Sequence, residues 1–299
     1  MQKKYWGFTA IILLLFIGIY IFIRISNKES YSYKIHRIEG SNNILRYINI
    51  PIQDILIPFI IDTGAESETL LIRDNYFTVL KHEKSSNKIQ SVSRYGTSIT
   101  NTAILKNIKL GEKTFNELEV GIFDSTHKFA QLEMLNNFSL IGWKVLKELD
   151  IYVDKSKSRI SFYSPNSNTD RIDYTNFQAY DIIQKDSLCV DFPLNKKSIH
   201  FIIDTGSGKY INDSIYNSLF YESVDYYREF PFKLKKDNTN GHEAYLRLIP
   251  DIDKVFKFYF RKSPAVFENR ISGFLTWDII DYADTYISSR DHKIYFDFN

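Results

Sequence analysis

The sequence has few of the residues and motifs that identify many protein classes at once. Its one cysteine, Cys189, excludes an intramolecular disulfide and any metal site built from several cysteines. Seven prolines and twelve glycines in 299 residues are too few for a collagen-like or low-complexity chain. Lysine and arginine exceed aspartate and glutamate by only two, 38 against 36, so the global charge predicts no nucleic-acid partner.

Motifs for metals, nucleotides and serine hydrolases are also missing. No glycine-rich phosphate loop and no G-x-S-x-G pattern occurs, so the sequence predicts no cofactor. The histidines have no metal-ligand spacing, which predicts no metal site, and we expect them on the surface or in loops. They are His36, His82, His127, His200, His242 and His292.

Hydrophobic residues, by contrast, are abundant. They make up 44% of the chain, with 23 Phe and 21 Tyr, which is enough for one or two cores and argues against disorder. Residues 5–23 form an uncharged run, mostly Ile, Leu and Phe, that would span about 28 Å as a helix. No small-residue cleavage site follows this run, so we expect an uncleaved membrane anchor rather than a signal peptide.

The predicted anchor covers residues 1–25 and contacts the membrane through residues 5–25, and a polar tether follows over residues 26–40. Lys3 and Lys4 precede the span, which favours a cytoplasmic N-terminus. We therefore expect a single-pass membrane protein whose soluble part lies outside the cytoplasm, on the periplasmic side of a bacterial inner membrane.

The remainder of the chain repeats once. Residues 59–64 recur without change at 201–206, an offset of 142 positions (204 − 62). A second block, residues 140–146, recurs in similar form at 274–280, an offset of 134. In both copies this block predicts a short helix, which leads into a strand, a polar turn and a last strand rich in Ile, Tyr and Phe.

We therefore expect two mostly β lobes, residues 41–163 and 181–299. A linker over residues 164–180 joins them.

The repeated hexapeptide ends in Asp-Thr-Gly. One such motif at the end of a buried strand is usually a turn in which the aspartate caps backbone N–H groups. Two copies related by a pseudo-twofold axis would bring Asp62 and Asp204 face to face. Carboxylates held that close share one proton, so that one serves as a base and the other as an acid toward a bound water.

The two motifs, each followed by an apolar-apolar-Gly or similar segment, resemble those of the pepsin and retropepsin aspartic peptidases. The resemblance covers roughly residues 44–299. It implies two homologous retropepsin-like β-barrel lobes in tandem, preceded by one transmembrane helix, and a monomer with internal pseudo-twofold symmetry. Asp62 and Asp204 would be the catalytic pair. Support for the active-site loops would come from Thr63, Gly64, Thr205, Gly206 and Ser207.

In that family an extended polypeptide substrate lies under β-hairpin flaps. The first-lobe candidate is the segment 91–98, with Tyr95 and Gly96 near its tip. The second-lobe candidate is 237–242, which contains Gly241. The alternative for both segments is an ordinary polar hairpin loop.

The second copy departs from the family pattern in two places. An alignment without gaps puts Thr276 where the first copy has Gly142, and the alternative counterpart is Gly273. The residue after the motif is Ala65 in the first copy and Ser207 in the second. A hydroxyl at this position can donate to the aspartate and favour its ionised form, so Asp204 is expected to ionise more readily than Asp62.

The sequence therefore predicts a membrane-anchored aspartic endopeptidase that hydrolyses peptide bonds with Asp62, Asp204 and an activated water. One alternative is a catalytically silent protein of the same fold that binds a peptide or a protein at the membrane. Another is a self-associating protein whose lobes pair between chains.

Overall fold

The computed structural model describes most of the chain after residue 30. The described residues are 31–38, 45–65, 69–93, 96–124, 127, 135–165, 172–184, 186–194, 197–206, 218–220, 233–236, 242–249, 253–261 and 271–299. The predicted anchor lies outside these ranges. Within them, none of the helices has the length and apolar character needed to cross a bilayer.

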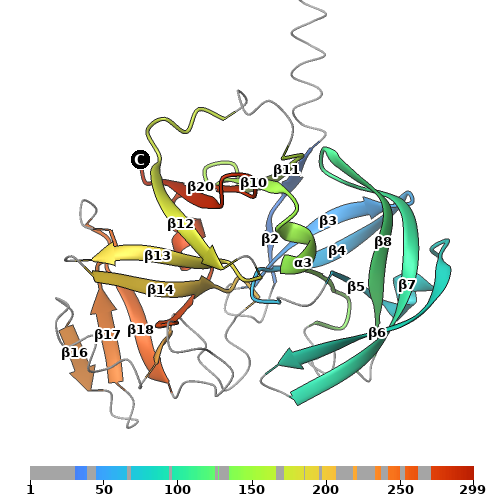
Figure 1. The fold of residues 1–299 in the computed structure, drawn as a ribbon, viewed down its shortest axis with the longest axis horizontal. Helices are drawn as coiled ribbons and strands as arrows, with labels where there is room; N and C mark the ends of the chain where they lie inside the picture. Colours follow the sequence, from blue (N-terminus) through green and yellow to red (C-terminus); the bar gives the residue numbers. More distant parts are fainter. Residues whose placement is uncertain are drawn as a thin grey trace, which may run out of the picture.

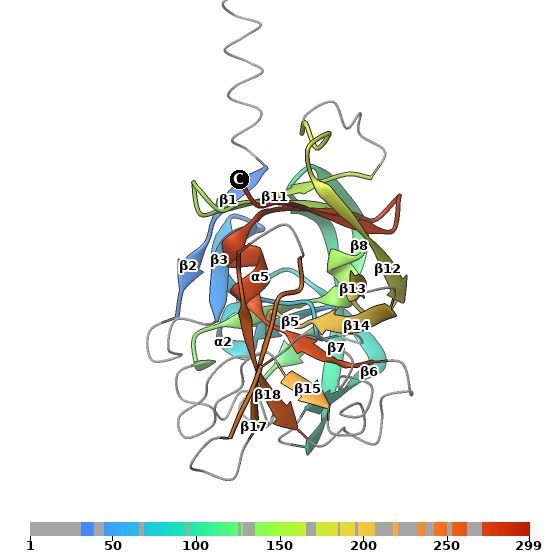
Figure 2. The same cartoon turned by 90° about the vertical axis from the view of Figure 1, so that its left-hand side faces the viewer.

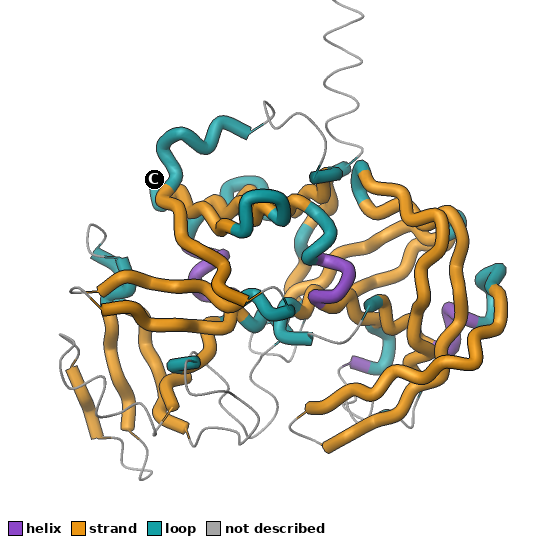
Figure 3. Tube along the Cα trace, viewed as in Figure 1, coloured by secondary structure: helices purple, strands orange, loops and turns teal. Residues whose placement is uncertain are grey.

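The fold is mostly β, as predicted, and its strands form two open sheets with parallel and antiparallel pairs (Figures 1 and 3). In the described residues one sheet has eight strands, in the order β2-β3-β4-β9-β5-β8-β7-β6. The other has thirteen, in the order β1-β11-β10-β20-β21-β12-β13-β14-β19-β15-β18-β17-β16.

The elements of the first half are β1 (Ser32–Lys34), β2 (His36–Arg37), β3 (Arg46–Ile52), β4 (Ile55–Asp62), β5 (Leu70–Arg73), α2 (Asp74–Phe77), β6 (Glu83–Ser93), β7 (Gly96–Leu110), β8 (Lys113–Phe123), β9 (Ser139–Gly142), α3 (Trp143–Leu146), β10 (Asp150–Asp154) and β11 (Arg159–Tyr163). Those of the second half are β12 (Gln178–Gln184), β13 (Cys189–Leu194), β14 (Lys197–Ile203), β15 (Ser218–Phe220), β16 (Lys233–Lys236), β17 (His242–Leu246), β18 (Phe256–Arg261), β19 (Gly273–Leu275), α5 (Trp277–Tyr282), β20 (Asp284–Ser288) and β21 (Lys293–Asp297).

The first hairpin shows how the sequence sets the strand that carries the first Asp-Thr-Gly motif. Strand β3 buries alternate residues, which include Ile48 and Ile50, and pairs antiparallel with β4. Gln53 and Asp54 make the turn between the strands with positive φ angles of 48° and 70°. A two-residue turn of this kind matches the right-handed twist of the flanking strands and fixes their register.

One end of the thirteen-stranded sheet is built from strands of both repeats (Figures 1 and 2). Strand β10 of the first repeat pairs antiparallel with β20 of the second, and Tyr152 lies opposite Tyr286. These two tyrosines are equivalent at the offset of 134 positions. A residue that pairs with its own counterpart lies on a local twofold axis, so the pseudo-twofold axis of the chain passes between them.

The shared sheet extends beyond the predicted lobe boundaries. Strand β1, in the segment predicted as a tether, pairs antiparallel with β11, and the guanidinium of Arg159 donates to Ser32. Strand β12 begins inside the segment predicted as a linker and pairs with β21. Both segments have polar compositions, but here β1 forms an edge strand and β12 forms an inner strand that joins β21 to β13.

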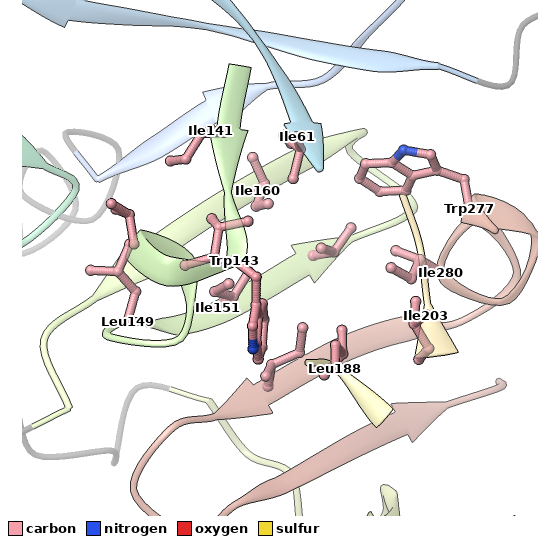
Figure 4. Close-up of a cluster of buried hydrophobic side chains, with 14 of the residues drawn as sticks. Ile61, Ile141, Trp143, Leu149, Ile151, Ile160, Leu188, Ile203, Trp277 and Ile280 are labelled. Carbon is pink, nitrogen blue, oxygen red and sulfur yellow. The ribbon is translucent and has the colours of Figure 1, made fainter. Parts of the chain in front are cut away.

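The hydrophobic core is also shared. One cluster of buried side chains contains residues of both lobes and of the sheet between them. Figure 4 shows Trp143 and Trp277, the first residues of α3 and α5, in this cluster together with Ile61 and Ile203. The two predicted short helices are therefore present, and each buries its tryptophan where the lobes meet.

Candidate active site

The two Asp-Thr-Gly motifs lie where a buried strand ends and the chain turns. Asp62 is the last residue of β4, and Asp204 directly follows β14. Each of these strands runs parallel to the strand that precedes the short helix of its repeat, β9 before α3 or β19 before α5. Both aspartates are half-buried. The same local fold therefore delivers one carboxylate from each repeat.

The threonines of the motifs interlock the two loops. The Thr63 N–H donates to Thr205 Oγ1 at 3.0 Å, and the Thr205 N–H donates to Thr63 Oγ1 at 3.1 Å. Each hydroxyl also donates across the axis, from Thr63 to the carbonyl of Ile203 at 2.5 Å and from Thr205 to that of Ile61 at 2.9 Å. Both threonines are buried. The four bonds are reciprocal and hold the loops in one relative position.

The glycines of the motifs are required because each faces the carboxylate of the other lobe. A Cβ atom added to Gly64 would overlap the carboxylate of Asp204, and one added to Gly206 would overlap that of Asp62. The Gly64 N–H donates to Asp62 Oδ1 at 3.0 Å. Gly64 is therefore next to both carboxylates. The structure thus brings together six of the predicted site residues: Asp62, Thr63, Gly64, Asp204, Thr205 and Gly206.

Strand register identifies the counterpart of Gly142. Gly142 pairs with Asp62 in the first repeat. In the second, Leu275 pairs with the residue before Asp204, and the Asp204 N–H donates to the Leu275 carbonyl at 2.7 Å. The next residue, Thr276, therefore takes the place of Gly142.

The other candidate, Gly273, pairs with Phe201 three residues earlier. A side chain fits at this position because the backbone does not need glycine there. Gly142 has φ −93° and Thr276 has φ −97°, which are extended values that any residue adopts. Thr276 is buried, at 3% exposure.

Candidate flap hairpins lie at both expected places. Strands β6 and β7 pair up to Ser93 and Gly96, and their paired ends point toward the midline of the molecule (Figure 1). Strands β16 and β17 pair up to Lys236 and His242. The other predicted site residues, Tyr95, Ser207 and Gly241, lie outside the described residues.

A second reciprocal contact joins the lobes, and the sequence reading missed it. The Tyr286 hydroxyl donates to Asp150 Oδ2 at 2.9 Å, and the Ser289 N–H donates to Asp150 Oδ1 at 2.8 Å. Asp150 is buried, at 1% exposure. Burial, and then the nearby charge of Asp150, raises the pKa of Tyr286 strongly. The phenol therefore stays protonated and remains a donor.

The same contact occurs with the lobes exchanged. The Tyr152 hydroxyl donates to Asp284 Oδ2 at 3.2 Å, and the Lys155 N–H donates to Asp284 Oδ1 at 2.8 Å. Burial and the charge of Asp284 raise the pKa of Tyr152 as well. All three positions follow their counterparts at the offset of 134 positions, so the repeat itself contained the signal for this contact.

Away from the axis, ion pairs join the lobes, and the residues that form them differ between the two sides. Arg46 on β3 is buried, forms an ion pair with Asp281 on α5, and lies 5.9 Å from the ring centroid of Trp277. Burial lowers the pKa of Arg46, and desolvation raises that of Asp281 despite the opposing charge. On the other side Lys147, directly after α3, binds Asp186 at 2.8 Å, in an exposed pair.

The histidines were expected on the surface or in loops, and three of them lie instead on strands β2, β14 and β17. His127 does lie in a loop, the one that follows β8, but it is not on the surface. His127 is only 5% exposed and packs edge-on against Phe123 at 4.7 Å. Burial lowers its pKa to about 4, so the ring is neutral at neutral pH. In the described part of the chain, no cluster of histidine, cysteine, aspartate or glutamate could hold a metal ion. Cys189 is buried.

Comparison with solved structures shows the fold. The chain is similar to conglutin gamma, a basic 7S globulin from lupine seeds, with a TM-score of 0.52 and 11% identity over 90% of this chain and 95% of that one. At this identity the similarity is one of fold and not of activity. The sequence matches no family model and no curated protein.

Proposed function

We propose that the protein is an aspartic endopeptidase of the bilobal pepsin and retropepsin type, anchored in a membrane by residues 5–25. It hydrolyses peptide bonds in extended polypeptides and uses no metal or cofactor. Its soluble part lies outside the cytoplasm, and it acts as a monomer. Its lobes correspond to the two barrel-like halves of that fold.

One observation carries this proposal: the carboxylates of Asp62 and Asp204 approach the same two loops at the pseudo-twofold axis. Such a pair resists double ionisation, so one member stays protonated over a wide pH range. The ionised carboxylate removes a proton from a water molecule, which attacks the peptide carbonyl. The protonated carboxylate donates to the carbonyl oxygen, and the leaving nitrogen is then protonated.

The interlocked loops support this chemistry because they fix the two carboxylates before substrate binds. Catalytic groups lose efficiency when their geometry relaxes by about 1 Å. The bonds of Thr63 and Thr205 to the opposite lobe are buried, which keeps water from competing for them.

A second candidate function is a binding protein of the same fold without catalysis. The observation that favours it is the similarity to conglutin gamma, which is described as a globulin and not as an enzyme. A fold of this kind therefore does not imply hydrolysis. Against this candidate, a binding module has no physical need for two facing carboxylates that oppose each other's ionisation.

The test is cleavage of a diverse peptide library by the full-length protein in detergent, from acidic to neutral pH. Asp62→Asn and Asp204→Asn are the test variants, and Asp74→Asn, which changes an exposed carboxylate on α2, is the matched control. We expect cleavage by the wild type and the control, and a loss of at least about 100-fold in either site variant. No cleavage by folded wild-type protein at any pH would overturn the proposal in favour of the binding protein.

A further inference from the structure

The segment that follows the predicted anchor is a fixed part of the fold. Strand β1 begins at Ser32 and pairs with β11, at the end of the thirteen-stranded sheet that contains strands of both repeats. The Tyr33 hydroxyl accepts a hydrogen bond from the Gly111 N–H at 2.8 Å, in the turn between β7 and β8. The Ile35 N–H donates to the Ser158 carbonyl at 2.8 Å. These bonds fix β1 both to the sheet and to one end of β7.

The chain between the predicted anchor and β1 is short. The uncharged run ends at residue 23 and β1 begins at Ser32, so only residues 24–31 lie between them. These eight residues (31 − 24 + 1) span at most about 29 Å when fully extended. A folded domain of roughly 270 residues is about 45 Å across. If residues 5–23 cross a bilayer, the end of the molecule that carries β1 therefore lies closer to the bilayer than one domain diameter.

The candidate flap hairpin of the first lobe lies at the other end of the molecule. Strand β7 has 15 residues and runs from Gly96, which pairs with Ser93 in the hairpin, to Leu110, next to the turn that binds β1. Figures 1 and 2 differ by a rotation about the vertical axis, and both show β11 at the top and the paired ends of β6 and β7 at the bottom. The flap could touch the bilayer only if β1 lay about one domain diameter, about 45 Å, above it, which the short connection does not reach.

We propose that the protein holds its cleft away from the bilayer and that its substrates are polypeptides whose cleaved bond lies far from the membrane surface. This inference rests on the proposed function, to which both the anchor and the hydrolysis belong. The substrate lies under the flap, at the end opposite β1, so a peptide bond close to a substrate's own membrane span does not reach Asp62 and Asp204. The substrate class is therefore soluble polypeptides and the membrane-distal segments of anchored ones.

The physical basis is the effective concentration of a substrate at the cleft. Two chains anchored in the same bilayer meet at a high effective concentration only where their segments can span the distance between the sites. A bond a few residues from a membrane span stays near the membrane surface, whereas a bond at the end of a long flexible segment reaches the level of the cleft. The pairing of β1 thus selects among the bonds of anchored proteins by their height above the bilayer, and it does not restrict polypeptides in solution.

Two exposed residues on β7 report this orientation without catalysis. The Lys109 ammonium lies 5.3 Å from the ring centroid of Tyr31, just before β1, and Ile99 lies on the flap hairpin. The strand separates them by up to about 33 Å. Lys109→Cys and Ile99→Cys are each labelled with a donor dye in the full-length protein, in phosphatidylcholine vesicles that carry an acceptor dye on the lipid headgroups. Cys189 is 0% exposed and stays unlabelled. Energy transfer from Lys109 should be at least about twofold stronger than from Ile99, given this separation.

The second measurement is the cleavage of a peptide anchored in the same vesicles. A Gly-Ser spacer of about 5 or about 40 residues joins its membrane span to a sequence that the protein cleaves in the peptide library. We expect the wild type to cleave the substrate with the long spacer at least about 10-fold faster. An insertion of about 20 Gly-Ser residues between residues 27 and 28 lets the domain turn and should reduce this ratio to below about threefold. The same insertion after Asn299 is the control and should leave the ratio unchanged.

The two measurements separate the inference from the proposed function. Equal transfer from the two positions, or equal cleavage at both spacer lengths, would overturn the inference while the proposed hydrolysis stands. Stronger transfer from Lys109 without cleavage of any peptide would support the orientation while the hydrolysis fails. No transfer from either position would show that residues 5–25 do not hold the protein in the bilayer, and the inference would then be wrong together with the anchor.

Discussion

The contacts between the lobes differ according to their distance from the pseudo-twofold axis. At the axis, Thr63 and Thr205 make the same bonds in both directions. Away from it, Arg46 faces Trp277 and Asp281. The residue equivalent to Arg46 at the offset of 142 positions is Leu188, which shares the core cluster with Trp143 (Figure 4).

The ion pairs also differ, because Asp281 on α5 corresponds, at the offset of 134 positions, to Lys147 directly after α3, and the two carry opposite charges. On a twofold axis a residue meets its own counterpart, so one residue type must satisfy both sides of the contact. Away from the axis each copy meets a different residue, and the copies are free to differ. The contacts between the lobes are therefore identical in both directions next to the two carboxylates, and they differ between the two sides farther from the axis.

The largest effect is expected at the threonines. Thr63→Val leaves the Ile203 carbonyl and the Thr205 N–H unpaired, and Thr205→Val leaves the Ile61 carbonyl and the Thr63 N–H unpaired. Each buried unpaired group costs about 1–3 kcal/mol. Either variant should lower the free energy of unfolding in denaturant titrations by about 2–6 kcal/mol.

The symmetry of these contacts predicts that the two variants lose equal stability. The matched controls are Thr63→Ser and Thr205→Ser, which keep the hydroxyls and should recover most of the loss. If the free energies of unfolding of the two valine variants differ by more than about 1 kcal/mol, the contacts at the axis are not energetically equivalent.

The next largest effect is the difference in stability loss between alanine substitutions at two glycines. Gly206→Ala places a methyl group against the Asp62 carboxylate and should cost about 3 kcal/mol and displace that carboxylate. Gly142→Ala should cost less than about 1 kcal/mol, because the backbone there is extended and the other lobe carries Thr276. Thermal unfolding and peptide cleavage of both variants test this, and equal losses would contradict it.

The buried tyrosines form the third test. Tyr286→Phe should cost about 2 kcal/mol, since it removes a short bond to the buried charge of Asp150. Tyr152→Phe removes a longer bond from a half-buried phenol and should cost about 1 kcal/mol. The measurement is urea unfolding of both variants. A larger loss for Tyr152→Phe would reverse the predicted order.

The smallest effect is a shift in pH dependence. Ala65→Ser adds a hydroxyl that can donate to the Asp62 carboxylate, which stabilises the ionised form and lowers its pKa. The alkaline limb of the pH–rate profile should then move to lower pH, because Asp62, the carboxylate expected to stay protonated and act as the acid, loses its proton at lower pH. Ala179→Ser, at an exposed position on β12, is the control. An alkaline limb that does not move would contradict the assigned effect of Ala65.

Much of the candidate site could be predicted because the repeat is local and nearly exact. The identical hexapeptides gave Asp62 and Asp204, and the tryptophan segments gave the two short helices, which the structure contains. The polar turns that precede β11 and β21 were also expected. They end at Ser158 and His292, which are equivalent residues with positive φ of 50° and 52°.

The features that could not be predicted from the sequence depend on contacts between segments that are distant in the chain. The strand β1 was not predicted, because its polar sequence forms a strand only by pairing with β11. The burial of His127 depends on its packing against Phe123, which no local pattern reveals. The choice between Thr276 and Gly273 needed the register of β14 and β19, since both residues suit an extended backbone.

The central claim is that one carboxylate from each lobe acts in the hydrolysis of the same peptide bond. It is tested most directly by the binding of a peptide in which a secondary alcohol replaces the scissile carbonyl, which mimics the tetrahedral state. Dissociation constants are measured by calorimetry for the wild type, Asp62→Asn and Asp204→Asn. We predict one bound peptide per chain and a loss of at least about 100-fold in affinity for either variant. Wild-type affinity in one of the two variants would contradict the claim.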